Sequence, residues 1–348
     1  MEKDRINKIQ EYLKEHELDA FLVLTKINRL YLSGFTGSMG AVLVTKRDAQ
    51  LFVDDRYTIR AKKESALAVG KWRALRLRSG SKIGVEDKIS MKEYGRMKRD
   101  YLGIKWRITS NVIENLRAIK TVREIKSITK AQNIIDRIFT IVKNGTIVGK
   151  TELQIAQWLE QTAIRQGADG MAFESIVAYG ANAAAPHHKP GSRKIKKGNF
   201  LLLDFGVLVR GYHSDFTRTL FIGRPNRKQE KIYGTVLEAQ RKGIVEVHSG
   251  RPAWHVDRAA RGVIVKAGFG RDFTHNTGHG VGLEIHELPN FSTQSSDILM
   301  ENMVVTVEPG IYQEHWGGVR IEDMVLVGRK GPELLSRAPK DLESMIIK

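Results

Sequence analysis

Cysteine is absent from the 348 residues of this chain. Its absence excludes a disulfide framework, a thiolate-bound zinc, an iron–sulfur cluster and a thiol nucleophile. Long apolar runs are missing as well, because no stretch approaches the ~18 uninterrupted apolar residues of a membrane span. The charged start of the chain, residues 1–5, has no apolar core of a signal peptide. We therefore expect a soluble, cytoplasmic protein with no membrane partner.

Acidic side chains are scarce relative to basic ones, 39 against 57, which gives a net charge of +18. The basic residues are densest at 71–78 and 92–107. Such an excess would suit an anionic partner such as nucleic acid. The basic residues alternate with apolar ones, however, and do not form a tail. We interpret them as a solvated surface, so nucleic acid is not the expected partner, although the charge does not exclude one.

The first 118 residues alternate between strand and helix patterns, which predicts a small α/β domain. An amphipathic helix opens it, with Ile6, Ile9 and Leu13 on one stripe. Two apolar runs joined by a short polar segment predict a hairpin. The remaining expected elements are strands at 19–24, 40–44, 49–53 and 83–85 and helices from 57 and from 90.

The second part, residues 119–348, opens with helical patterns and continues with apolar runs between glycines and prolines. We expect helices at 122–142, from 152, near 228–248 and at 254–267. Thr151 to Gln154 forms a capping box, and the helix after it has its expected apolar face at Leu153, Ala156, Leu159 and Ala163. No low-complexity linker separates the two parts, so the junction near residue 120 is a fold boundary and not a flexible tether.

The same pattern of strand, acid, glycine-containing turn and second acid occurs twice in this second part. Asp204 ends the apolar run 200–204, and Asp215 lies eleven residues on, before the run 216–222. Glu308 follows the run 303–307, and fourteen residues later Glu322 stands inside an expected strand at 319–327. An acid in an apolar strand is costly unless it is paired or binds a metal. Two divalent metals would hold four converging carboxylates together and would ionise a shared water.

Histidines for such a site are present in the glycine-rich segment 277–287, which holds His279 and His286, with His275 just before it. Glycines allow the backbone to approach a ligand closely. Oxygen-dominated ligation with one imidazole suits Mn²⁺ or Co²⁺ and leaves Fe²⁺ and Zn²⁺ open. The residues alone therefore indicate a dinuclear metal site and argue against a structural zinc.

Five segments resemble the signature segments of the pita-bread metallopeptidases, the family of methionine aminopeptidase, prolidase and aminopeptidase P. They occur in the family's order and are 203–206, 214–219, 278–287, 307–310 and 320–323. The resemblance implies a mixed α/β (α+β) protein. A creatinase-like N-terminal domain, residues 1–118, would precede a pita-bread catalytic domain, residues 119–348, with a pseudo-two-fold antiparallel sheet.

The same resemblance implies roles for individual residues. The five metal ligands, which would hold two divalent ions with Mn²⁺ as first choice, are Asp204, Asp215, His279, Glu308 and Glu322. Glu308 would also shuttle a proton, and His286 would stabilise the tetrahedral intermediate. Substrate contacts are implied for His187, His275, His286, Tyr212 and Arg320, of which His275 lines the proline side.

The N-terminal domain distinguishes the Xaa-Pro branch from methionine aminopeptidases, which usually lack it. Residues 31–38 resemble the opening motif of that domain in aminopeptidase P, and Asp55 replaces a glycine of the next motif, 54–57. Creatinase shares the fold but lacks the metal ligands. We therefore expect an Xaa-Pro aminopeptidase that cleaves between an N-terminal residue and proline. The alternative is a prolidase acting on dipeptides only, and many relatives of either kind are homodimers.

A rival from another class is a non-catalytic binding protein, since this fold has been reused as an interaction module. The +18 charge would suit an acidic partner of such a protein. When the fold is reused for binding, the residues at the metal-ligand positions are normally replaced by other types. All five positions of this chain still hold suitable ligands. The enzyme is therefore the favoured interpretation. The physiological metal and the preferred first residue stay open.

Overall fold

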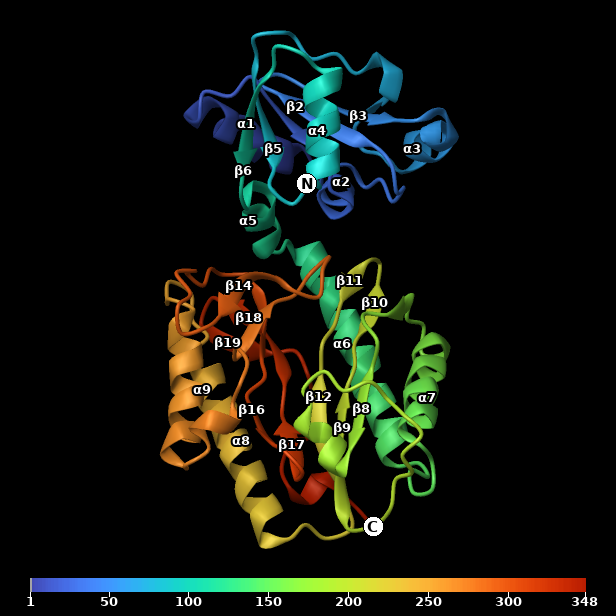
Figure 1. The fold of residues 1–348 in the computed structure, drawn as a ribbon, viewed down its shortest axis with the longest axis vertical. Coiled ribbons are helices and arrows are strands. Elements are labelled where there is room, and N and C mark those ends of the chain that lie inside the picture. Colours follow the sequence, from blue (N-terminus) through green and yellow to red (C-terminus); the bar gives the residue numbers. More distant parts are fainter. Residues whose placement is uncertain (1) are drawn as a thin grey trace. The chain divides into compact units, whose positions relative to one another are not determined.

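A computed structural model describes residues 2–348 and divides the chain into two compact units (Figure 1). One unit extends to Arg117, and the other is Ala118–Lys348. Each unit has a hydrophobic core of its own. Among the described residues, no helix is both long enough and apolar enough to cross a membrane.

The N-terminal unit is built on a six-stranded sheet with the order β4-β3-β2-β1-β5-β6. Strands β1, β2 and β3 are antiparallel neighbours, whereas β4, β5 and β6 join in parallel. The elements are α1 (Glu2–Glu15), β1 (Ala20–Val23), α2 (Lys26–Ser33), β2 (Ala41–Thr45), β3 (Ala49–Val53), α3 (Thr58–Glu64), β4 (Ala68–Lys71), β5 (Lys82–Glu86), α4 (Met91–Asp100), β6 (Lys105–Thr109) and α5 (Val112–Ala118).

Apolar spacing explains how these elements form. Ile6, Ile9 and Leu13 are buried along one stripe of α1, as the helical period requires. The expected hairpin is confirmed, since Ala41 lies opposite Phe52 in the antiparallel register of β2 and β3. The strand and helix pattern of this part therefore predicted its α/β architecture correctly.

The second unit contains several sheets of mainly antiparallel strands between helices, with β12 and β20 as a parallel pair. Its helices are α6 (Val122–Lys143), α7 (Glu152–Arg165), α8 (Arg227–Val245) and α9 (Trp254–Lys266). Its strands are β7 (Gly170–Met171), β8 (Ile176–Tyr179), β9 (Asn199–Asp204), β10 (Val207–Val209), β11 (Tyr212–His213), β12 (Thr217–Ile222), β13 (Gly278–Gly280), β14 (Glu287–Phe291), β15 (Val304–Val307), β16 (Gly310–Gln313), β17 (Gly317–Arg320), β18 (Asp323–Gly328), β19 (Gly331–Leu334) and β20 (Ile346–Ile347).

Helices cover the strands of this unit from two sides. In Figure 1, α6 and α7 lie on one side of the strands, and α8 and α9 lie on the other. The largest sheets have the orders β20-β12-β9-β8 and β14-β13-β15-β18-β19. The main core joins buried residues of α6, α7, β9, β12 and α8. The mixed α/β (α+β) class expected from the sequence is confirmed.

Equivalent antiparallel pairs of strands deliver the two acid pairs. In the β9–β12 pair Asp204 lies opposite Thr217, and in the β15–β18 pair Val307 lies opposite Asp323. Each pair therefore ends at the point where its acids stand. This register brings residues that are far apart in the sequence to the same end of two strand pairs.

The expected strand at 319–327 is wrong in one respect. Its apolar run is divided into β17, which pairs with β16, and β18, which pairs with β15. Glu322 lies in the break, where its backbone N–H donates to the carbonyl of Thr217 at 3.1 Å. The break has a physical reason, since the chain passes there from one sheet to another. Hydrophobicity alone does not reveal such a transfer.

The expected apolar face of α7 is also partly wrong. The capping box at Thr151 starts the helix at Glu152 and turns that carboxylate into the interior. Ile155 is then fully buried, whereas Leu153 is 48% exposed. A polar side chain at a buried position therefore concealed the true face of the helix.

Candidate active site

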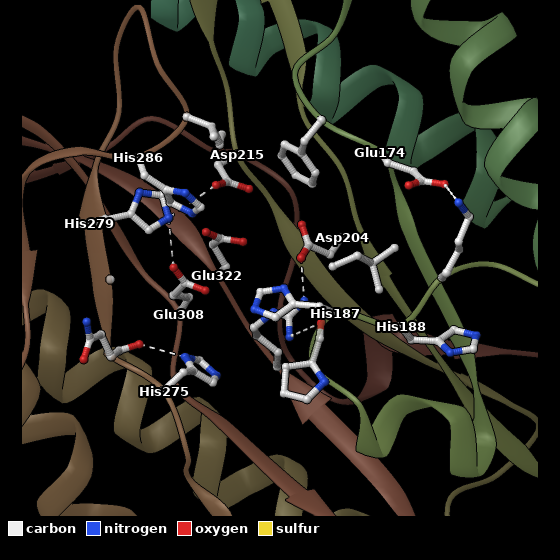
Figure 2. Close-up of a pocket in the computed structure, with 18 of the residues that line it drawn as sticks. Glu174, His187, His188, Asp204, Asp215, His275, His279, His286, Glu308 and Glu322 are labelled. Carbon is white, nitrogen blue, oxygen red and sulfur yellow. Dashed lines mark hydrogen bonds and ion pairs between the residues drawn. The ribbon is translucent and has the colours of Figure 1, made fainter. Parts of the chain in front are cut away.

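A pocket of about 570 Å³ opens in the second unit where the two strand pairs end (Figure 2). All five expected metal ligands line it, and so do four further expected site residues. The lining residues with predicted roles are Asp204, Asp215, His279, Glu308, Glu322, His187, His275, His286 and Arg320. The structure therefore brings together nine of the ten residues that the sequence singled out.

The ligand atoms converge on a small volume. One ligand atom each of Asp215, His279 and Glu322 lie within 4.8 Å of one another. His279 Nε2 is 3.2 Å from Glu308 Oε1 and 3.6 Å from Asp215 Oδ2. Such spacings suit side chains that share one or two metal ions.

Hydrogen bonds fix the orientation of His279. Its Nδ1 lies 3.1 Å from the carbonyl oxygen of Gly280, to which an Nδ1–H would donate, so Nε2 faces Glu308 and Asp215. Its backbone N–H donates to Thr306 Oγ1 at 3.0 Å, and that hydroxyl donates to Glu308 Oε1 at 3.1 Å. Thr306, which the sequence did not single out, therefore links two of the expected metal ligands.

The glycines beside His279 are needed for packing between strands. A Cβ on Gly278 would come 2.1 Å from the carbonyl oxygen of Thr306, and one on Gly280 would come 2.1 Å from that of Leu288. Both contacts are far shorter than a carbon and an oxygen tolerate. The two glycines thus allow the neighbouring backbone to approach β13 closely and hold His279 in place.

Burial raises the pKa of three carboxyl groups in the pocket. Burial is the main cause for Asp204, Asp215 and Glu322, and the charges of neighbouring acids add to it, so their pKa values lie above the ordinary range. For Glu308, burial is outweighed by the hydrogen bond and charge of His279, which lower its pKa to about 2. For His279, burial is likewise outweighed by Glu308, which raises its pKa to about 9.

Two buried carboxylate oxygens point to cations. Asp204 Oδ1 and Glu322 Oε1 have no hydrogen-bond partner among the described residues. The second oxygen of each group is held: Arg320 donates to Asp204 Oδ2, and Thr217 Oγ1 donates to Glu322 Oε2 at 2.6 Å. A buried, unpaired carboxylate oxygen is costly, and a divalent ion removes that cost. The oxygen-rich donor set with one imidazole therefore fits divalent metals of the manganese or cobalt type.

Arg320 connects the acids to the other side of the pocket. Besides Asp204, it donates to Tyr312 Oη at 2.8 Å and to the carbonyl of Pro186. Tyr312 Oη also lies 2.8 Å from His275 Nε2, and burial raises the pKa of this phenol to about 12. Sequence reasoning missed Tyr312, although its place in the strand after residues 307–310 could have indicated it.

The remaining histidines line the pocket in different ways. The ring of His286 lies 4.3 Å from that of His279 at 83°. Burial, followed by the charge of His279, lowers the pKa of His286 and so favours its neutral form. Burial also lowers the pKa of His275. His187 lies between Asp204 and His188 in Figure 2.

A buried carboxylate holds the segment that carries His187. Glu152 Oε1 accepts from the backbone N–H of Tyr179 and from Asn182 Nδ2, both at 2.8 Å. Glu152 Oε2 lies 2.9 Å from His188 Nε2 and accepts from the Gly191 N–H at 3.1 Å. Glu152 therefore clamps both ends of the loop that forms one pocket wall. Apart from the capping box, no feature of the sequence indicated this role of Glu152.

Tyr212 is the one predicted site residue that the structure places elsewhere. It does not line the pocket, and its hydroxyl donates to Glu124 Oε1 at 2.8 Å. Glu124 belongs to the capping box at the start of α6. The geometry thus connects Tyr212 with a helix terminus and gives no support to a substrate contact.

Comparisons with known proteins agree with this arrangement. Residues 126–329 match "Metallopeptidase family M24", and residues 5–119 match "Creatinase/Prolidase N-terminal domain". The chain is 35% identical over 345 residues to an Xaa-Pro dipeptidase of Pyrococcus horikoshii, which covers 97% of this chain and 98% of that protein.

Two solved structures resemble the whole chain. An Xaa-Pro dipeptidase from Bacillus anthracis matches with a TM-score of 0.94 and 35% identity, covering 100% of both chains. An X-Pro aminopeptidase from Thermotoga maritima matches with a TM-score of 0.89 and 32% identity, covering 98% of this chain and 99% of that one.

Proposed function

Because this chain belongs to metallopeptidase family M24, as the sequence predicted, we propose that it hydrolyses the peptide bond between an N-terminal residue and proline. The single observation that carries the proposal is the convergence of five ligand side chains on one pocket, with Asp204 Oδ1 and Glu322 Oε1 buried and unpartnered. Full-length relatives bear the names of Xaa-Pro dipeptidases and of an X-Pro aminopeptidase, which supports the substrate class.

In this proposal, Asp204, Asp215, His279, Glu308 and Glu322 hold the metals. Divalent ions in such a site polarise a carbonyl oxygen and lower the pKa of water toward neutrality. Glu308 would accept the proton of the attacking water at a carboxylate oxygen and pass it to the leaving nitrogen. The free substrate amine would bind on the side of Asp204 or Asp215, which restricts action to the N-terminus.

Several side chains would assist the reaction without holding metal. A neutral His286 can donate a hydrogen bond to the developing oxyanion, a contribution of the kind worth about 3–4 kcal/mol. The leaving group would be the proline nitrogen, which carries no N–H. His275 would line the proline side, and His187 would contact the substrate from its clamped loop.

Dipeptidase and aminopeptidase activities remain two forms of this proposal. The residues at 31–38 favour the aminopeptidase, whereas the names of the Pyrococcus and Bacillus relatives favour the dipeptidase. The same site serves both, so only substrate length separates them. We further propose Mn²⁺ as the preferred metal, a homodimer as the assembly and the cytoplasm as the location.

The test is an assay of metal-stripped protein with Mn²⁺ and Co²⁺ restored separately. Substrates are Xaa-Pro dipeptides and Xaa-Pro-Xaa tripeptides. Cleavage of tripeptides establishes the aminopeptidase, and cleavage of dipeptides alone establishes the prolidase. Metal shown to be bound without cleavage of either substrate would overturn the proposal.

A further inference from the structure

The pocket has a wall whose charges the proposed reaction does not use. Glu174 lies on the side of Asp204 that faces away from His275 (Figure 2). Glu174 Oε1 forms an ion pair with Lys189 Nζ at 3.3 Å, and Phe173 and Ile176 line the pocket beside it. This wall therefore combines apolar surface with one charge of each sign.

The other charged side chains that line the pocket already have a bonding partner or a proposed role in metal binding. Among the described lining residues, the only Lys or Arg besides Lys189 is Arg320, which is buried and bonded to Asp204 and Tyr312. The remaining carboxylates lie in the metal-ligand cluster. The side chains of Lys189 and Glu174, in contrast, are 79% and 69% exposed. An exposed pair of this kind contributes little to stability, so either partner can exchange the other for a charged ligand.

The backbone that presents Lys189 is fixed although its side chain is free to move. Glu152 bonds His188 and Gly191, which flank the dipeptide Lys189–Pro190. Beyond the ion pair a second cavity of about 410 Å³ continues along α7, and it shares Phe173, Glu174, Lys189 and Pro190 with the first. A long substrate side chain that reaches the ion pair therefore has room to extend into the second cavity.

We propose that Glu174 and Lys189 select the side chain of the substrate's first residue. This inference rests on the proposed function. The substrate amine would lie on the Asp204 side and proline on the His275 side, so the first side chain must extend away from His275. The apolar wall would bind its methylene groups. Its charged end would pair with Glu174 when it is Arg or Lys and with Lys189 when it is Glu.

Charge reversal tests the proposal, with kcat/KM measured for Arg-Pro, Glu-Pro and Leu-Pro in the Mn²⁺-loaded full chain. Glu174→Lys should shift the ratio of Arg-Pro to Glu-Pro about tenfold toward Glu-Pro, and Lys189→Glu should shift it about tenfold the other way. Leu-Pro should change less than twofold. Both shifts should shrink at high salt because exposed charges are screened.

Matched controls separate local pairing from net charge. Glu238→Lys and Lys242→Glu make the same charge changes at exposed positions of α8, outside the pocket lining, and should leave every ratio unchanged. Normal Leu-Pro cleavage with an unchanged Arg-Pro to Glu-Pro ratio in both pocket variants would overturn the inference alone. A wild-type chain that cleaves none of the three substrates would overturn the proposed function and this inference with it.

Discussion

Among single residues, Glu308 carries the most demanding role, because it is expected to hold metal and to move a proton. Its Oε1 lies 3.2 Å from His279 Nε2 and accepts from Thr306 Oγ1. We expect Glu308→Ala to lower kcat by at least about 10²–10⁴-fold, the usual contribution of acid–base catalysis. Kinetics at matched metal content, checked by elemental analysis, measures the effect. A near-wild-type rate at full metal occupancy would exclude the proton-transfer role.

Glu152 is expected to act through the loop that it clamps. Glu152→Ala would leave the N–H groups of buried Tyr179 and half-buried Gly191 without acceptors, a loss of about 2–4 kcal/mol in stability. If the clamp also positions His187, the Glu152→Ala variant should show a larger factor of increase in KM than of decrease in kcat. Thermal unfolding and steady-state kinetics measure the two effects. Gln161→Ala, an exposed change on the same helix outside both cavities, is the control and should alter neither.

The same carboxylate gives a pH dependence of stability. Burial raises the pKa of Glu152, but its bonds to His188, Tyr179, Asn182 and Gly191 outweigh burial and lower that pKa below its ordinary value of 4.5. A lowered folded-state pKa adds stability above pH 4.5 that is lost as the pH falls through the folded-state value. His188 is the titratable side chain that faces it. We therefore expect the Tm difference between wild type and Glu152→Gln to shrink as the pH falls below 4.5. A difference that stays constant down to pH 3 would contradict this assignment.

At the level of elements, a buried ion pair joins the strands that deliver the two acid pairs. Arg218 in β12 is fully buried and bonds Asp323 in β18 at 2.6 Å. The Arg218 guanidinium also donates to the carbonyl of Glu322. Lys340, which is 17% exposed, contacts the same carboxylate. The pair therefore fixes the two strands, and with them the expected metal ligands, relative to each other.

Removing the fully buried Arg218 should cost more stability than removing Lys340, whose side chain is 17% exposed. We expect Arg218→Met to destabilise the second unit by about 3–5 kcal/mol, since it leaves a buried carboxylate partly uncompensated. Lys340→Met should cost clearly less, because Arg218 still pairs with Asp323. Calorimetric unfolding of both variants gives the comparison. Equal Tm losses would show that burial of Arg218 is not what makes the pair important.

The sequence predicted helices and strands most accurately where the spacing of apolar side chains followed a helical or strand period. Ile6, Ile9 and Leu13 marked α1 correctly, and the pairs of acids at strand ends predicted a single site. It failed at Glu322, where an apolar run hides a change of sheet, and at Leu153, where buried Glu152 shifts the apparent face of α7. Bonds formed by residues distant in the sequence, such as those of Tyr312, leave no periodic trace. Such contacts therefore cannot be predicted from the spacing of apolar residues alone.

At the scale of the whole molecule, the two compact units have separate cores, and the candidate metal ligands belong to one of them. All five lie in Ala118–Lys348. A ligand that binds only the folded state stabilises it by RT ln(1 + [L]/Kd), about 2.7 kcal/mol at one hundred times Kd. Metal should therefore stabilise this unit without direct effect on the unit that ends at Arg117.

Calorimetry of the full chain, with and without Mn²⁺, tests this independence. We expect two transitions, of which only the one assigned to Ala118–Lys348 moves to higher temperature with metal. The assignment comes from Arg218→Met, which should lower that transition alone. In Glu308→Ala the shift caused by metal should be reduced, because one ligand is lost. A metal-induced shift of both transitions by equal amounts would contradict independent units, since it requires the two cores to unfold together.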